Sequence, residues 1–105
     1  MTESEFATKS AELLNRIEEA IDAVDLDIDF ERKGDGVLEI EFADRSRVIV
    51  NTQAPMRQIW VAAKSGGFHF EFVGGGWRDT RSGENLMVLL ARVMSEQTRV
   101  AVDLG

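Results

Sequence analysis

The spacing of apolar residues changes twice along this chain, and that order constrains the fold more than any other feature. Over roughly residues 4–24 apolar side chains recur every three or four positions, which predicts an amphipathic helix. The residues of this stripe are Phe6, Leu13, Ile17, Ala20, Ile21 and Val24. Ser4 is the expected N-cap, because its hydroxyl can accept a hydrogen bond from an amide of the first turn.

After residue 25 apolar residues alternate with polar ones, which is the period of half-buried strands. In the first such stretch, Leu26–Glu31, every second residue is an acid. Turn residues such as Gly34-Asp35-Gly36 and Ser65-Gly66-Gly67 separate the stretches. The pattern predicts about six strands, at residues 26–31, 37–43, 47–52, 58–64, 68–72 and 77–80.

A helical stripe returns near the end of the chain, with Ser82 as its expected N-cap and its end near Gln97. Its apolar residues are Leu86, Leu89, Leu90, Val93 and Met94. Short links between strands favour an antiparallel sheet. Only one face of that sheet has large apolar residues, so both helices should cover that face. We therefore expect one domain over residues 1–105, an α+β two-layer sandwich.

The charge of the chain is unevenly distributed. Residues 1–44 contain 14 acidic and four basic residues, whereas residues 45–105 contain five acidic and eight basic residues. This asymmetry favours cationic partners for the first half and argues against binding of nucleic acid phosphates there. The absence of cysteine excludes disulfides and thiolate metal sites. With no signal peptide or membrane-spanning stretch in the sequence, we expect a cytoplasmic protein that does not enter a membrane.

Six carboxylates follow one another across the end of the first helix and the first strand. Glu18, Asp22 and Asp25 fall on one line of the helix near its C-terminal end, where the helix dipole disfavours negative charge. Asp27, Asp29 and Glu31 continue the same sign on the strand. Repeated violation of local preferences often marks a functional site. The simpler alternative is a solvated face that only promotes solubility.

Carboxylates are hard oxygen ligands, suited to ferric iron, magnesium, calcium and manganese. Same-face neighbours on a strand lie about 6.8 Å apart, which is too wide for two of them to hold one ion tightly. The expected result is several shallow sites of one or two carboxylates each, completed by water. Their affinity should be modest and their selectivity poor.

Trp60 is a second notable feature. It alternates with Ile59 and Val61 and therefore lies on the sheet face opposite the helices, between Gln58 and Ala62. An exposed tryptophan among amides is a common anchor for a protein partner. The alternative is that a neighbour such as Arg57, or a loop, covers the indole.

Evidence for an enzyme is weak. The single histidine, His69, is expected on the outer face of a strand, where a solvated residue is more common than a base. The Gly74–Gly76 run has no P-loop lysine and leads into a strand, so a plain loop is the better interpretation. We expect no catalytic residues.

Several motifs together resemble bacterial members of the frataxin family. They are Ser4-Glu5-Phe6, Ile17-Glu18-Glu19, Gly36-Val37-Leu38, the run Asn51–Ala62, Gly66–Phe70, and Trp77 followed by Arg81-Ser82-Gly83-Glu84. The pattern Asn-x-Gln-x-Pro-x-x-Gln-x-Trp within the run is specific. The resemblance covers nearly the whole chain and implies the same helix–sheet–helix fold.

The resemblance also implies iron binding and docking to protein partners. The implied iron or docking residues, which we call the acidic ridge, are Glu18, Glu19, Asp22, Asp25, Asp27, Asp29 and Glu31. The implied partner residues, which we call the sheet surface, are Asn51, Gln53, Gln58 and Trp60. The implied partners are a cysteine desulfurase and the iron–sulfur scaffold protein. The chain departs from its relatives at Ala23, where another acid is common, and Arg32 and Lys33 dilute the end of the ridge.

The leading hypothesis is an iron-binding regulator or iron donor in iron–sulfur cluster assembly, monomeric without iron. The first alternative is an adaptor that modulates the desulfurase and never carries iron. The second is an enzyme, such as a ferroxidase that uses the ridge as its iron site, although no buried and preorganised metal site is visible in the sequence.

Overall fold

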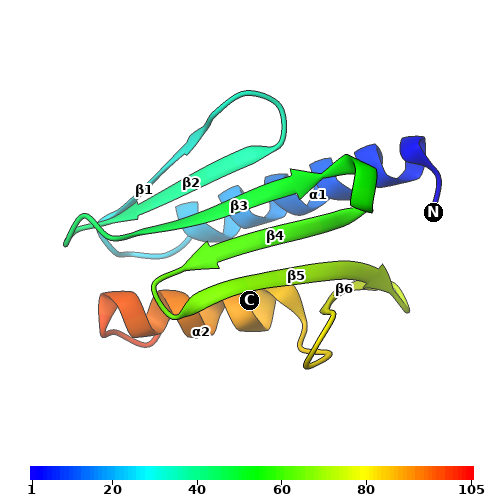
Figure 1. Cartoon of the computed structure of the whole chain (residues 1–105). Coiled ribbons are helices and arrows are strands. Elements are labelled where there is room, and N and C mark those ends of the chain that lie inside the picture. Colours follow the sequence, from blue (N-terminus) through cyan, green and yellow to red (C-terminus); the bar gives the residue numbers. More distant parts are fainter.

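A helix, six strands and a second helix follow one another in a computed structural model that describes residues 1–105 (Figure 1). The elements are α1 (Glu3–Asp22), β1 (Ile28–Arg32), β2 (Val37–Phe42), β3 (Arg47–Gln53), the short 3-10 helix η1 (Ala54–Met56), β4 (Gln58–Ala63), β5 (Gly66–Val73), β6 (Gly76–Asp79) and α2 (Leu86–Thr98).

The strands form one antiparallel sheet in the order β1-β2-β3-β4-β5-β6, so each strand pairs with its neighbour in sequence. Both helices lie behind the same face of this sheet in Figure 1. The other face has no layer of the chain over it, and we call it the open face. The predicted two-layer α+β sandwich is confirmed.

The apolar stripes meet in one cluster between the sheet and the helices. Ile17 of α1, Ile40 of β2, Ile59 of β4 and Leu90 of α2 are all completely buried there. Burial of each such side chain contributes about 1.5–3 kcal/mol relative to exposure. Val102 and Leu104, beyond the last helix, are also buried in the cluster, which the sequence pattern did not indicate.

The ends of the helices differ from the prediction. Thr2, not Ser4, caps α1: its hydroxyl accepts a hydrogen bond from the Glu5 amide, and the Glu5 carboxylate accepts one from the Thr2 amide. This reciprocal pair is a capping box. The helix ends at Asp22, two residues before the predicted end, and Val24 follows it as a partly buried residue outside the helix.

Asn85, not Ser82, caps α2. The Asn85 Oδ1 atom accepts hydrogen bonds from the amides of Met87 and Val88, whereas the Ser82 hydroxyl accepts one from the Glu84 amide in the preceding turn. The first strand begins at Ile28 rather than at residue 26, and β5 begins at Gly66 rather than at residue 68. Neither helix is long and apolar enough to cross a membrane.

Candidate metal and partner surfaces

The acidic ridge runs along one edge of the molecule, from the C-terminal half of α1 through the connecting turn to the edge strand β1. All residues of the ridge are exposed except Glu18, which is half-buried. The strand residues Asp29 and Glu31 point to the open face, because their neighbours Ile28 and Phe30 are packed against the core. The ridge is therefore a continuous exposed surface and not a pocket.

Glu18 differs from the rest of the ridge because it is already paired. The Arg32 guanidinium donates to both carboxylate oxygens of Glu18, at 2.7 and 3.1 Å, and also to the Asn15 carboxamide at 2.8 Å. This fork joins the end of β1 to the middle of α1. The sequence predicts only that Arg32 lowers the net negative charge at the end of the ridge. In the structure, Arg32 pairs specifically with Glu18, so the Glu18 carboxylate is not free to bind a metal ion.

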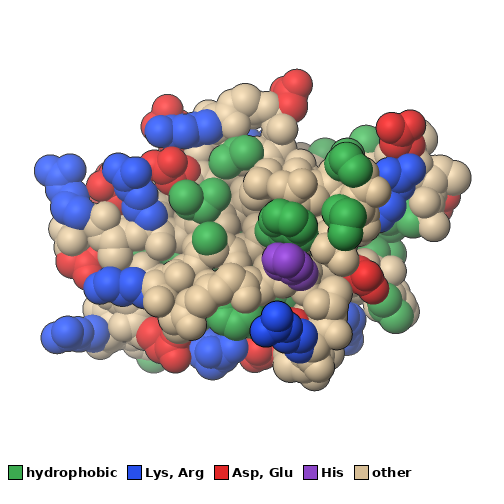
Figure 2. Space-filling model, in the orientation of Figure 1, with side chains coloured by type: hydrophobic (Ala, Val, Ile, Leu, Met, Phe, Trp, Pro, Cys, Tyr) green, Lys and Arg blue, Asp and Glu red, His purple; other side chains and the backbone are tan.

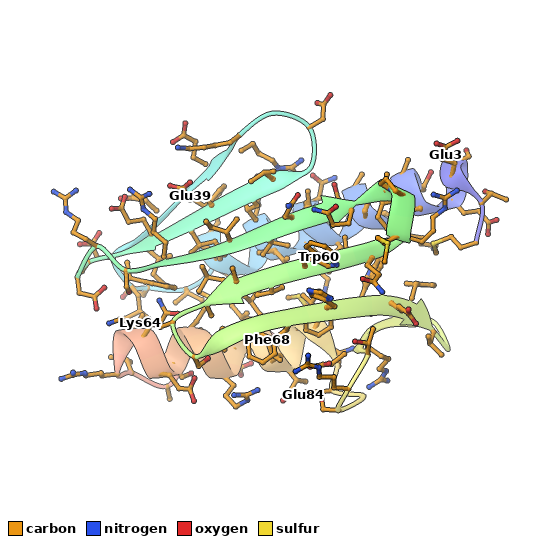
Figure 3. The ribbon with its side chains drawn as sticks, viewed as in Figure 1. Glu3, Glu39, Trp60, Lys64, Phe68 and Glu84 are labelled. Carbon is orange, nitrogen blue, oxygen red and sulfur yellow. The ribbon has the colours of Figure 1, made fainter.

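Two more carboxylates extend the acidic surface onto β2. Asp29 lies directly opposite Glu41, and Glu31 lies directly opposite Glu39. Like charges at such positions repel each other. Basic side chains offset the repulsion: Lys33 and Arg47 lie 3.5 and 3.3 Å from Glu39, which Figure 3 labels, and Arg45 lies 3.8 Å from Glu41. The alternation of β2 places both glutamates on the open face, and the strand register shows that they lie beside the ridge.

A shallow hollow of about 270 Å³ lies where the ridge meets β2. Asp27, Asp29 and Glu41 line it together with Arg45. No group of three His, Asp or Glu side chains in the chain comes together closely enough to hold a metal ion. The arrangement suits hydrated hard cations held by one or two carboxylates each.

Trp60 lies on the open face, as predicted, and a neighbouring side chain covers part of its indole. Its indole stacks on His69 of β5, with ring centroids 4.3 Å apart and planes 7° apart. The indole N–H donates to the Gln58 Oε1 atom at 2.8 Å, and the Gln58 amide donates to Glu71 at 3.2 Å. Trp60 is therefore half-buried, covered by His69 and not by Arg57 or a loop.

The sheet surface is assembled by strand pairing. Asn51 lies opposite Trp60, and Gln53 lies opposite Gln58, so the four predicted partner residues occupy adjoining positions of β3 and β4. Figure 3 labels Trp60 near the middle of the sheet, and Figure 2 shows the single histidine beside a hydrophobic side chain on this face. His69 and Glu71 also belong to this region. Sequence alternation had placed His69 outward without indicating its contact with Trp60.

Comparison with known proteins identifies the family of the chain. The family model described as "Frataxin-like domain" matches residues 1–100. The chain belongs to the frataxin family. A relative from Paraburkholderia xenovorans (strain LB400), named "Iron-sulfur cluster assembly protein CyaY", is 50% identical over 97 residues, which cover 92% of this chain and 91% of the relative. A protein of the same name from Dechloromonas aromatica (strain RCB) is 49% identical over 104 residues, 99% of each chain.

Solved frataxin structures have the same fold. Frataxin from Psychromonas ingrahamii is 32% identical, with a TM-score of 0.92 over 100% of this chain and 99% of that chain. Trimeric frataxin from Saccharomyces cerevisiae, described as complexed with ferrous, is 26% identical, with a TM-score of 0.67 over 94% of this chain and 88% of that chain.

In this frataxin the two candidate surfaces are separate. The ridge lies on and beside β1, whereas Trp60 lies on β4, three strands away. Three strand spacings amount to about 14 Å. A substitution in one surface therefore leaves the direct contacts of the other intact, so the two can be tested independently.

Proposed function

We propose that this frataxin is an iron-binding regulator or iron donor in iron–sulfur cluster assembly. In this proposal it holds iron weakly on the acidic ridge and acts through the cysteine desulfurase complex, without catalysing a reaction. The observation that carries the proposal is that relatives of about 50% identity over nearly the whole chain are named iron–sulfur cluster assembly proteins.

The ridge supports the iron-binding part of this proposal. Its six members other than Glu18 form no salt bridge within the protein. They are Glu19, Asp22, Asp25, Asp27, Asp29 and Glu31. Unpaired, exposed carboxylates offer oxygen ligands without a compensating rearrangement. On this surface the protein would carry iron as an ion to be delivered. One or two carboxylates and water would bind each ion weakly, so that it is easily released. The ferrous complex of yeast frataxin is consistent with such a role.

The sheet surface supports the partner-binding part. Stacking on His69 and the hydrogen bond to Gln58 fix the orientation of the Trp60 indole. Little side-chain entropy therefore remains to be lost when a partner docks. We propose that it contacts the cysteine desulfurase or the iron–sulfur scaffold protein, with Asn51, Gln53 and Gln58 beside it. We further propose that the protein is a monomer without iron and works in the cytoplasm, where its bacterial relatives would meet the assembly machinery.

The second candidate function is an adaptor that modulates the desulfurase without carrying iron. The observation that favours it is that no three carboxylates converge on one point, while Arg32, Arg45, Lys33 and Arg47 already neutralise neighbouring acids. In that case the ridge would meet a basic protein surface.

A crossed comparison of two variants tests both functions. Asp22→Lys plus Asp27→Lys should weaken ferrous iron binding at least tenfold, because ligands and attraction are both removed. Trp60→Ala should leave iron binding unchanged and weaken desulfurase binding by more than 2 kcal/mol, about thirtyfold, as expected for a hot spot. Calorimetric titration with ferrous iron under anaerobic conditions measures iron binding. A second calorimetric titration, with the desulfurase, measures partner binding.

Glu3→Lys plus Glu96→Lys is the matched control, because it makes the same change in net charge on exposed helical positions away from the ridge. If the ridge variant kept its iron affinity and lost only desulfurase binding, the adaptor function would replace the iron function. If Trp60→Ala lost stability but bound the desulfurase normally, the sheet surface would have no role in docking.

A further inference from the structure

A pocket of about 220 Å³ lies on the helix side of the sheet, and none of the residues that line it belongs to the acidic ridge or to the sheet surface. This open pocket is lined by the middle of α1, the start of α2 and the β5–β6 hairpin. In Figure 1 the two helices lie behind the sheet, and the hairpin lies at the sheet edge opposite β1. We call it the hairpin pocket; the side chains that matter below are those of Lys9, Arg16, Phe72, Trp77 and Asn85.

The inner wall of the hairpin pocket is apolar and fixed. Trp77 is only 6% exposed and meets Phe72 edge-to-face, with ring centroids 5.3 Å apart. Phe6 contacts Trp77 in the same manner at 5.9 Å. Buried Leu13 and Leu86 complete the wall. Because these side chains are held by the core, the apolar wall exists before any ligand arrives.

The rim of the pocket is basic, although the helix that supplies it is acidic. Residues 1–44 contain only four basic residues, and two of them, Lys9 and Arg16, line this pocket. The other two, Arg32 and Lys33, form salt bridges elsewhere. Lys9 lies 3.6 Å from Glu12 and 5.7 Å from the centre of the Phe72 ring, whereas Arg16 has no salt bridge. An unpaired guanidinium therefore stands at the rim of a pocket whose inner wall is apolar.

A third donor comes from the cap of α2. The Asn85 Oδ1 atom is occupied by the amides of Met87 and Val88, but the Asn85 Nδ2 group donates to no acceptor in the protein. Gly76 lies beside it: a Cβ atom at that position would be 3.5 Å from Nδ2. Two basic side chains and one acidic side chain line the pocket, and the acidic one, Glu12, already pairs with Lys9.

We propose that the hairpin pocket binds a small organic anion with one carboxylate on a flat apolar body. The carboxylate would accept hydrogen bonds from Arg16 and Asn85, and the body would lie against Phe72 and Trp77. The volume equals that of about seven water molecules, which limits the ligand to roughly ten non-hydrogen atoms. The cavity is smaller than typical sites for drug-sized ligands, so the expected dissociation constant is near 1 mM.

Phenylacetate is a suitable probe, with two matched controls. Phenylacetamide has the same shape without charge, and acetate has the charge without the ring. In ¹H–¹⁵N spectra, phenylacetate should shift the Trp77 indole N–H and backbone amides near residues 9–16 and 85–87, with half-saturation near 1 mM. The Trp60 indole, on the open face, is an internal control that should not move. Both control ligands should bind at least tenfold more weakly.

Arg16→Gln should weaken phenylacetate binding at least fivefold, because it removes the unpaired cation from an exposed position without disturbing the core. Lys64→Gln makes the same change in charge in the turn between β4 and β5, at the far end of β5 from the β5–β6 hairpin, and should leave binding unaltered. Three results would overturn the proposal: no shift at 10 mM phenylacetate, equal binding of phenylacetamide or acetate, or unaltered binding by Arg16→Gln. None of them depends on the iron or desulfurase roles.

Discussion

Arg32 decides which carboxylates of the ridge are available. Its guanidinium holds both oxygens of Glu18 and the Asn15 carboxamide, and it does so from the last residue of β1. A bidentate arginine–carboxylate pair is geometrically specific, so Glu18 is fixed against the strand. The ridge therefore has one member with a structural role and six whose charge is not offset by a salt bridge.

Arg32→Gln should release Glu18 as a ligand. We expect a loss of less than about 1 kcal/mol in the free energy of unfolding, because the pair is more than a third exposed on the arginine side. Binding of a hard cation such as calcium should become stronger. Isothermal titration with calcium, alongside urea denaturation, measures both quantities. Arg78→Gln on the opposite edge strand controls for net charge; if it raised calcium affinity equally, Glu18 would not be the cause.

At the residue scale, sequence alone could identify the ridge but not its pairing. Acids at helical spacing and on alternate strand positions are visible in the sequence. The contact between Arg32 and Glu18 is not, because it depends on how closely β1 lies along α1. The same holds for Trp60 and His69, whose stacking follows from the register of β4 and β5.

At the scale of elements, periodicity predicted both helices and all six strands, but not the helix ends. Serine was the expected cap at Ser4 and Ser82, since serine is a common N-cap. The caps proved to be Thr2 and Asn85, whose side-chain oxygens reach the free amides of the first turn. The choice among nearby capping residues depends on where the core first holds the helix, and this is not a local property of the sequence.

The capping box of α1 has a consequence for stability in acid. The hydrogen bonds from Thr2, the one from its backbone amide foremost, lower the pKa of Glu5 from its ordinary value of 4.5. A lowered pKa in the folded state means that the charged carboxylate stabilises the fold. This stabilisation is present above pH 4.5 and is lost as the pH falls through the folded pKa.

Glu5→Gln should therefore be less stable than the original protein at pH 7 and lose that disadvantage in acid. The glutamine oxygen can still accept the Thr2 hydrogen bond, but it has no charge to favour the helix N-terminus. Urea denaturation of both proteins at pH 7 and below pH 4 tests the expectation. A difference in unfolding free energy that did not change with pH would show that the Glu5 charge contributes nothing.

At the scale of the whole molecule, the acidic side chains are concentrated in one region, and the folded core does not depend on them. The core is built from α1, the sheet and α2 without any ridge residue. Net charge influences association and electrostatic repulsion more than fold. The uneven distribution of charge between the two halves of the chain was predictable from counts of acidic and basic residues alone. Only the fold shows where the three regions lie: the ridge along the β1 edge, the sheet surface in the middle of the open face, and the hairpin pocket on the helix side.

The last prediction concerns the response of the whole protein to cations. The six unpaired ridge acids repel one another in the folded state, and two cross-strand acid pairs add to this repulsion. Sodium chloride should raise the melting temperature by screening, since the Debye length falls to about 10 Å at 0.1 M. Calcium or ferrous iron should act at far lower concentration by binding the native state; a hundredfold excess over the dissociation constant adds about 2.7 kcal/mol.

Thermal unfolding followed by circular dichroism at constant ionic strength separates binding from screening. Asp22→Lys plus Asp27→Lys should blunt both responses, because two reversals remove ligands and repulsion together. Glu3→Lys plus Glu96→Lys should keep the response to calcium, since its ridge is intact. If the melting temperature were indifferent to sodium chloride and to multivalent ions, the ridge would be only a solvated face. The iron-binding part of the proposed function would then have no physical basis, whereas docking through the sheet surface would be unaffected.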